Sequence, residues 1–300
     1  MGVEIVAEGL VMTYGDLRAV DDVSFTVGPG EFFGLLGPNG AGKTTTLEMV
    51  EGLRRPQAGT VRIDGHEPWR REPGLQRRIG VQLQSSSFFD RLTAREQLET
   101  FGSLYRVAAG RTDAMLEQVG LVDKADVRTE DLSGGQKQRL SIACALVHDP
   151  EVVFLDEPTA ALDPQARRNL WDVLRTINDS GRTVILTTHH MDEAEVLCDR
   201  VAIMDAGRML ELDTPAALVR GLDAPVRISL APGTLAVEDA RELAGDDPVV
   251  AEESALTITT RDPSRVLTAL AARDALAGLS VKGASLEDVF LDLTGREYRA

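Results

Sequence analysis

Hydrophobic and polar residues alternate along the first 30 residues, and the alternation is interrupted at residues 14–16 and 28–30. A period of two is typical of strands with one buried face, and the glycine and proline residues at the interruptions indicate turns. The pattern therefore predicts an antiparallel β region at the start of the chain. A short apolar run at residues 31–37 leads into a glycine-rich loop, and residues 44–53 have helical spacing.

The middle of the chain alternates between short apolar runs and longer segments with helical periodicity. Apolar runs rich in β-favouring residues predict strands of a parallel sheet that is covered on both faces. Asp163 is the expected N-cap of one of the helices, and the helical stretch at 93–119 predicts an inserted α region. The predicted strands are 61–64, 79–84, 152–155 and 184–188, the predicted helices are 93–119, 134–147, 164–177 and 191–197, and residues 201–210 form a predicted hairpin.

The composition changes near residues 220–225, and the segments beyond are strand-like at 226–230 and 255–260 and helical at 264–276. We therefore expect one domain over residues 1–220 and a small C-terminal α+β domain over residues 225–300. A chain of 300 residues with 43% hydrophobic content is sufficient for one large core and such an appendage.

Acidic residues outnumber basic ones by 48 to 32, which gives a net charge of −16. An acidic surface repels phosphate backbones, so we expect no nucleic acid partner. Cys144 and Cys198 lie in apolar segments, and we interpret both as small buried hydrophobic residues in a reducing compartment. The chain has no N-terminal secretory pattern and no apolar run of about 20 residues, so we do not expect it to cross a membrane itself.

The glycine-rich loop before residues 44–53 has the pattern of a phosphate-binding loop. Its glycines let backbone N–H groups converge on phosphate oxygens at the positive end of the following helix. We expect Lys43 to contact the β and γ phosphates, Thr44 to offer a hydroxyl to Mg²⁺ and Thr45 to add a further donor. The predicted phosphate-binding residues are Gly37, Pro38, Asn39, Gly40, Ala41, Gly42, Lys43, Thr44 and Thr45.

Two acidic residues, Asp156 and Glu157, follow the predicted strand at 152–155. A carboxylate at the end of a strand can hold Mg²⁺, and we assign this role to Asp156, through water. Glu157 is then the expected general base that polarises the attacking water.

A short run with two adjacent glycines opens the predicted helix at 134–147. Its serine hydroxyl and exposed backbone N–H groups form an anion site, although an ordinary N-cap has the same pattern. The residues of this run are Leu132, Ser133, Gly134, Gly135 and Gln136.

This run, together with the phosphate loop and the acidic pair, resembles the signature of the ATP-binding cassette (ABC) ATPases. The resemblance implies an α/β fold: a P-loop NTPase domain of the ABC type, with a RecA-like core, an antiparallel β subdomain and a helical subdomain. It also implies that the run contacts ATP held by a second copy of the domain. We therefore expect a homodimer that closes head to tail on ATP and Mg²⁺.

Several residues gain roles only from this resemblance. Gln84 matches the glutamine that senses Mg²⁺ and the γ-phosphate, with Gln82 as a nearby alternative, and His189 matches the switch histidine, with His190 beside it. The expected catalytic residues are therefore Glu157, His189 and Gln84, and the expected magnesium residues are Thr44, Gln84 and Asp156.

Tyr14 matches the aromatic residue that stacks on adenine in this family, although in isolation it reads as a half-buried strand tyrosine. Asp163 matches a residue of the loop that links the two ATP sites across the dimer. As the expected N-cap of a helix it has a second, compatible role.

Residues 285–296 resemble the tail of bacterial exporter ATPases of the daunorubicin-resistance type, although a generic amphipathic helix has a similar pattern. We therefore expect an exporter ATPase at the cytoplasmic side of the membrane, bound to permease subunits near Phe88 and Phe89. An ATPase of an importer is an alternative. A soluble ABC ATPase that acts on DNA is disfavoured, because the short segment between Gln84 and Ser133 lacks coiled-coil heptads. One that acts on ribosomes is disfavoured as well, because members of that kind normally carry two cassettes in one chain and this chain has one. A small-molecule kinase does not fit the signature.

Overall fold

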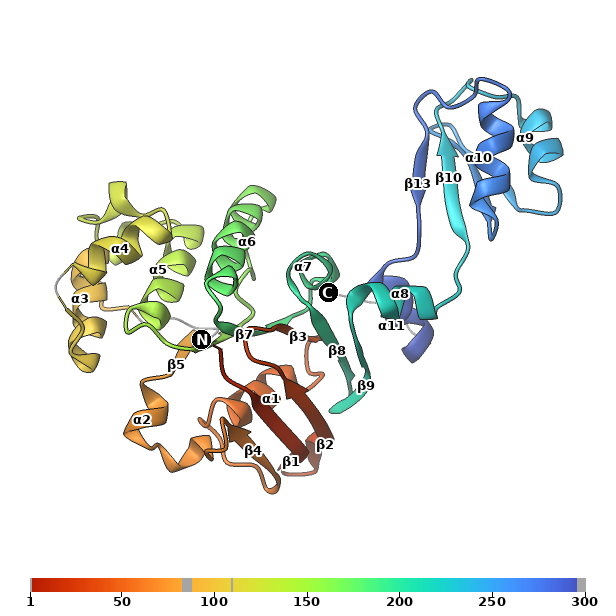
Figure 1. Cartoon of the computed structure of the whole chain (residues 1–300). Helices are drawn as coiled ribbons and strands as arrows, with labels where there is room; N and C mark the ends of the chain where they lie inside the picture. Colours follow the sequence, from red (N-terminus) through yellow and green to blue (C-terminus); the bar gives the residue numbers. More distant parts are fainter. Residues whose placement is uncertain (1, 83–87, 109, 296–300) are drawn as a thin grey trace. The chain divides into compact units, whose positions relative to one another are not determined.

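The computed structural model describes residues 2–82, 88–108 and 110–295, which form two compact units (Figure 1). The first unit ends at Pro215 and the second begins at Ala216, so helix α8 (Pro215–Gly221) belongs to the second unit except for its first residue. The predicted change of composition near residue 220 falls at the end of this helix. The division into domains 1–220 and 225–300 stays a prediction.

The first unit contains a three-stranded antiparallel sheet in the order β2-β1-β4. Its strands are β1 (Ile5–Tyr14), β2 (Leu17–Val27) and β4 (Ala58–Ile63). Buried residues recur at every second position of β1 on either side of a register shift between Ala7 and Leu10, as a strand with one buried face requires. The predicted antiparallel β region is confirmed.

A six-stranded sheet in the order β5-β6-β7-β3-β8-β9 follows. Its strands are β3 (Phe32–Leu36), β5 (Ile79–Gln82), β6 (Val152–Asp156), β7 (Thr183–Thr188), β8 (Arg200–Asp205) and β9 (Arg208–Asp213). All neighbours are parallel except β8 and β9. Every residue of β3, β6 and β7 is buried, as expected for a sheet covered on both faces. Because parallel strands end at one edge, the loops that follow these three strands meet there.

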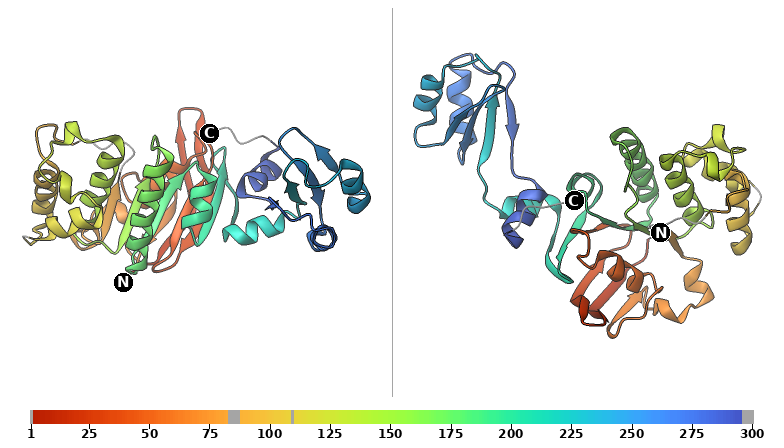
Figure 2. Two further views of the ribbon diagram at one scale, coloured as in Figure 1. Left: turned by 90° about the horizontal axis from the view of Figure 1, so that it is seen from above. Right: turned by 180° about the vertical axis from the view of Figure 1, so that it is seen from behind.

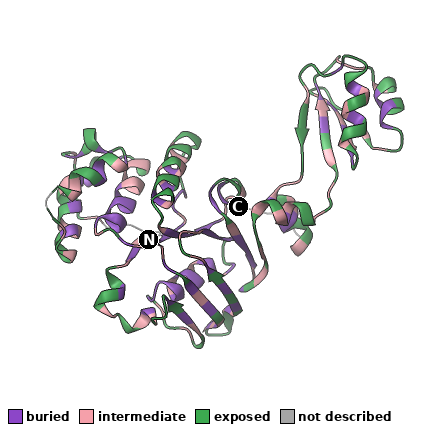
Figure 3. Ribbon diagram, viewed as in Figure 1, coloured by how far each residue is buried: buried purple, intermediate pink, exposed green. Residues whose placement is uncertain are grey.

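Helices cover the central strands of this sheet, and β3, β6 and β7 are buried throughout (Figure 3). Helices α1 (Lys43–Val50) and α7 (Met191–Leu197) contact its strands, and α6 (Pro164–Asp179) packs against α7. Asp163 caps α6, as predicted, since its carboxylate accepts hydrogen bonds from the backbone N–H groups of Gln165 and Ala166, both at 2.9 Å.

Three further helices gather beside β5, and both views of Figure 2 show them together. They are α3 (Ala94–Tyr105), α4 (Arg111–Gln118) and α5 (Gly134–Leu146). The prediction of one helical stretch over 93–119 was wrong in detail. Arg106, with φ of 58°, ends α3, and Gly110, with φ of 96°, precedes α4. The left-handed backbone at these positions breaks the helical path. Short helices η1 (Pro68–Arg70), α2 (Pro73–Gln76), η2 (Val122–Lys124) and η3 (Thr129–Asp131) complete the first unit.

The second unit has a four-stranded antiparallel sheet in the order β11-β12-β10-β13. Its core includes Ile228, Ile258, Val266 and Leu270, none of which contributes exposed surface. Among the helices of the described segments, none has the length and apolar composition that crossing a membrane requires. The remaining elements are β10 (Val226–Leu230), α9 (Val237–Ala244), β11 (Val249–Ala251), β12 (Leu256–Thr260), α10 (Pro263–Ala271), β13 (Ser280–Lys282) and α11 (Leu286–Thr294).

Candidate active site

The phosphate loop follows β3 and leads directly into α1, which is the predicted strand–loop–helix order. Gly42 is the N-cap of α1 with φ of 97°, and a Cβ at this position would lie 2.4 Å from the carbonyl oxygen of Ala19. A Cβ at Gly37 would lie 2.2 Å from the carbonyl oxygen of Met204. The strands on either side of the loop therefore admit only glycine at these two positions.

Lys43 is held at the centre of the site and is only 4% exposed. Its Nζ donates to the carbonyl oxygen of Pro38 at 3.0 Å and lies 3.5 Å from Oε1 of Glu157. Burial lowers the pKa of Lys43, and the neighbouring Glu157 opposes this shift. The lysine charge is therefore placed beside the carboxylate that the sequence predicts to act as a base.

Asp156 lies at the end of β6 and faces two hydroxyl groups. Its Oδ1 accepts from Oγ1 of Thr187 at 2.6 Å and from Oγ1 of Thr44 at 3.0 Å. Burial raises the pKa of Asp156, whereas these two hydrogen bonds favour the charged form. Thr187 reaches Asp156 because the two residues are partners in the parallel pairing of β6 with β7.

Glu157 has the left-handed φ of 46°, and its backbone N–H donates to Thr187, at 3.2 Å to the carbonyl oxygen and 3.0 Å to Oγ1. Its Oε2 lies 3.3 Å from Nδ1 of His189. The ring of His190 lies against His189, with centroids 4.1 Å apart, and burial lowers the pKa of His190. The contact with Glu157 distinguishes His189 from its neighbour.

The signature run starts α5, with Ser133 as its N-cap. The Ser133 side chain accepts from the backbone N–H of Gln136 at 3.3 Å, and the Gln136 side chain accepts from the backbone N–H of Ser133 at 2.9 Å. Leu132 is buried, whereas Ser133 and Gly134 are exposed and Gly135 is half-buried. This is a complete capping box, and it leaves the beginning of the helix accessible from outside.

The loop before α6 packs against the signature within the same chain. A Cβ at Gly135 would lie 3.4 Å from Cβ of Ala166 and 3.7 Å from Cδ2 of Leu162. Asp163, which caps α6, lies between these two neighbours in sequence and is exposed. The two motifs therefore share one surface region.

Tyr14, at the end of β1, is 42% exposed. The guanidinium carbon of Arg54 lies 5.2 Å from its ring centroid, and Nε of Arg54 donates to Glu48 at 2.7 Å. The ring is thus fixed and partly accessible, as adenine stacking requires. Gln84 lies outside the described residues, and the alternative Gln82 is buried in β5.

Sequence reasoning missed two residues near this site. Thr187 completes the contacts of Asp156, and its only signal in the sequence was its place in the strand before His189. Glu51, which follows α1, is 7% exposed, and its carboxyl has a pKa raised to about 8 by burial and by the charges of Asp156 and Glu48. A helical pattern gave no indication of a buried acid there.

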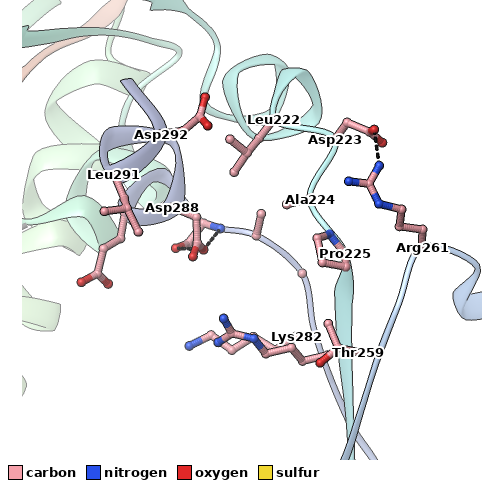
Figure 4. Close-up of a pocket in the computed structure, with 15 residues that line it drawn as sticks. Leu222, Asp223, Ala224, Pro225, Thr259, Arg261, Lys282, Asp288, Leu291 and Asp292 are labelled. Carbon is pink, nitrogen blue, oxygen red and sulfur yellow. Dashed lines mark hydrogen bonds and ion pairs between the residues drawn. The ribbon is translucent and has the colours of Figure 1, made fainter. Parts of the chain in front are cut away.

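A separate pocket of about 590 Å³ lies in the second unit, among the residues drawn in Figure 4. Its charged groups have both signs. Arg261 pairs with Asp223 at 2.5 Å, and Asp288 accepts from the backbone N–H of Ser285 at 2.9 Å. The acidic side chains of Asp223, Asp288 and Asp292 line this pocket and would repel a triphosphate, so the phosphate loop is the better nucleotide site.

Comparison with known proteins agrees with this geometry. Residues 20–160 match the family described as ABC transporter. The chain is 42% identical to the Nod factor export ATP-binding protein I of Paraburkholderia xenovorans (strain LB400), over 96% of this chain and 95% of that protein. The chain belongs to the ABC transporter ATP-binding subunits. It is also 36% identical to the linearmycin resistance ATP-binding protein LnrL of Bacillus subtilis (strain 168), over 98% of this chain and 99% of that protein.

A solved structure of an ATP binding subunit of an ABC transporter matches the fold with a TM-score of 0.65 and 27% identity, over 72% of this chain and 92% of that one. The predicted family and fold class are therefore confirmed. The chain binds ATP and is an ATPase of the kind that powers transport, and such subunits work with permease subunits in the membrane.

Proposed function

We propose that this ABC ATP-binding subunit powers an exporter from the cytoplasmic side of the membrane, as a homodimer bound to separate permease subunits. Two relatives that match nearly the full length of the chain support an exporter. One is named for Nod factor export and the other for linearmycin resistance. The observation that carries the proposal is the cluster of Lys43, Asp156, Glu157 and His189 at the ends of three parallel strands.

The phosphate loop binds the triphosphate of ATP. The N-terminal end of α1 and residues 37–45 offer backbone N–H groups, and the Lys43 ammonium takes the β and γ phosphates. Lys43 then exchanges its contact with Glu157 for the phosphate oxygens. Binding of ATP thereby releases the Glu157 carboxylate for the reaction.

The side chains around Asp156 fit a magnesium ion, since carboxylate and hydroxyl oxygens are the ligands that Mg²⁺ prefers. Asp156 and Thr44 already share a hydrogen bond of 3.0 Å. We assign them to the metal, together with Gln84. Bound Mg²⁺ would neutralise charge on the β and γ phosphates.

Glu157 polarises the water that attacks the γ phosphorus. The new bond joins the water oxygen to phosphorus while the bond to the ADP oxygen breaks, and the products are ADP and inorganic phosphate. His189, 3.3 Å from Glu157, contacts the γ-phosphate on the same side. Tyr14 stacks on the adenine ring.

The signature acts on the second copy of the chain. Ser133 and Gly134 are exposed at the start of α5, where backbone N–H groups and the helix dipole favour an anion. In a head-to-tail dimer these groups contact the γ-phosphate held by the partner's phosphate loop. Asp163, whose loop packs on the signature, links the two ATP sites.

The permease contact lies near the loop before α3. A shallow apolar pocket of about 530 Å³ is lined by Phe89, Asp90, Arg91, Leu92 and Thr100. Phe89 is 58% exposed, while Phe88 is half-buried. An apolar side chain from a permease helix fits this surface.

The test is a Glu157→Gln variant of the full-length chain. It should bind Mg-ATP, hydrolyse it very slowly and elute from gel filtration as a dimer with ATP, because the closed state is no longer released. Lys43→Ala is the matched control, which should lose ATP affinity and stay monomeric. A Glu157→Gln chain that remains monomeric at saturating ATP contradicts the head-to-tail dimer.

A further inference from the structure

The segment that follows α1 contacts the end of strand β1, where Tyr14 lies. Tyr14 is the last residue of β1 and pairs with Leu17 of β2 across the turn, so its ring stands at the tip of a hairpin. A ring with 42% of its surface exposed is only partly held by the core. The contacts made by residues 52–57 therefore decide how this ring is presented to a base.

A glycine turn leads the chain back toward α1. Gly52 has φ of 83°, and a Cβ at this position would lie 2.7 Å from atoms of Pro68, so only glycine fits the turn. The backbone N–H of Arg54 then donates to the carbonyl oxygen of Glu48 at 2.9 Å, and Nε of Arg54 donates to Oε2 of Glu48 at 2.7 Å. Two hydrogen bonds thus join Arg54 to the helix that the phosphate loop opens.

The guanidinium of Arg54 lies over the Tyr14 ring, with its carbon 5.2 Å from the ring centroid. A cation within about 6 Å of an aromatic centroid is attracted to the face of the ring. Gln57 holds the backbone just before the ring, because its Oε1 accepts from the N–H of Thr13 at 2.9 Å and its Nε2 donates to the carbonyl oxygen of Thr13 at 3.1 Å. One segment of the chain therefore fixes both the ring and the backbone that carries it.

Arg54 and the phosphate loop belong to opposite ends of α1. The loop opens the helix at Lys43, and Arg54 lies beyond its last residue, Val50. The eight residues of the helix span about 12 Å. The guanidinium thus reaches Tyr14 from the end of the helix that is remote from the phosphates, and the exposed part of the ring stays open to a base.

We propose that Arg54 and Gln57 are positioning residues for nucleotide binding, which hold Tyr14 in the orientation in which it stacks on adenine. The inference rests on the proposed stacking role of Tyr14. A side chain that is already ordered costs less entropy on binding, and this is worth about two- to tenfold in affinity. Arg54 and Gln57 contribute to the affinity for the base and not to the hydrolysis of the γ-phosphate.

The test compares Arg54→Ala with Arg55→Ala, which removes the same charge from the exposed neighbouring residue. Arg54→Ala should weaken the binding of ATP and ADP by about two- to tenfold in titration calorimetry and raise KM by a similar factor, at the parental kcat. Arg55→Ala should bind both nucleotides as the parent chain does. An equal loss in the two variants would reduce the effect to charge alone and overturn the proposal, as would parental affinity in Arg54→Ala.

Inorganic tripolyphosphate with Mg²⁺ separates a role toward the base from damage to α1, because it offers phosphates without a base. Its affinity should be the same for Arg54→Ala and the parent chain. If tripolyphosphate loses as much affinity as ATP, the variant disturbs the phosphate loop and the proposal falls. Gln57→Ala leaves the guanidinium in place and should weaken ATP binding in the same way as Arg54→Ala. If Arg54→Ala does not fold, parental affinity in Gln57→Ala overturns the proposal on its own.

Tyr14→Ala, assayed in parallel, separates this inference from the proposed function. Because Arg54 acts through the ring, Arg54→Ala should cause no further loss of ATP affinity in the Tyr14→Ala chain, and full addition of the two losses overturns the coupling. If Tyr14→Ala weakens ATP binding while Arg54→Ala binds as the parent does, only the positioning role falls. If Tyr14→Ala itself has the parental affinity, the proposed stacking role falls and the inference falls with it.

Discussion

Replacement of Glu51 by glutamine should remove a loss of folding stability that the parent chain shows as the pH rises. Oε2 of Glu51 is buried without a hydrogen-bond partner among the described residues, and the pKa of the carboxyl is raised from 4.5 to about 8. Between these values the folded chain holds a proton that the unfolded chain has released. The contribution of Glu51 to stability is therefore greatest at low pH and decreases as the pH rises toward 8.

The size of the effect follows from the shift. Each pH unit inside this window lowers the free energy of unfolding by about 1.4 kcal/mol, so the total by pH 8 is roughly 4 kcal/mol. At about pH 5 the neutral acid and the glutamine amide are alike in size and charge, and the two chains should be similarly stable. At about pH 8.5 Glu51→Gln should be more stable, with a melting temperature about 10 °C higher.

Thermal unfolding of the full chain without ATP or Mg²⁺, followed from about pH 5 to about pH 8.5, measures this difference. Other acidic residues also titrate, so the informative quantity is the difference between Glu51→Gln and the parent chain at each pH. Glu4→Gln, which changes an exposed residue of the same unit, should show no pH-dependent difference. If Glu51→Gln differs from the parent by the same amount at both ends of the range, Glu51 does not titrate as a buried acid.

Two other substitutions test single contacts of the nucleotide. Tyr14→Ala should weaken ATP binding by about tenfold or more in titration calorimetry, because stacking on a base is worth about 1–3 kcal/mol, whereas Tyr14→Phe should bind as the parent does. Equal affinity in the alanine variant would refute the stacking role. Ser133→Ala, placed in the Glu157→Gln chain, should still bind ATP on the phosphate loop but form much less dimer in gel filtration. An undiminished dimer would leave the serine as a helix cap alone.

The elements with strong periodicity could be predicted from the sequence, and those held by tertiary contacts could not. Helix α7 and strand β10 begin and end where the pattern predicted, because a regular apolar spacing sets their limits. The short strands β11 and β13 were missed, since three residues carry no readable period. The break between α3 and α4 depends on left-handed backbone at Arg106, a residue type that gives no such signal.

The residues of the candidate site also fall into a group that could be predicted from the sequence and a group that could not. Motif residues such as Lys43 and Asp156 were found because their chemistry depends on local spacing in the sequence. Thr187 was not, because it reaches Asp156 only through the pairing of β6 with β7. A single sequence does not specify which strands become neighbours, so contacts between residues about 30 positions apart stay hidden until the sheet order is known.

A structure of full-length Glu157→Gln determined with Mg-ATP tests the head-to-tail dimer most directly. We expect two nucleotides at the interface, each with its γ-phosphate between Lys43 of one copy and the Ser133 hydroxyl of the other. ATP bound on the phosphate loop while Ser133 of every copy faces solvent would contradict the proposed mode of action.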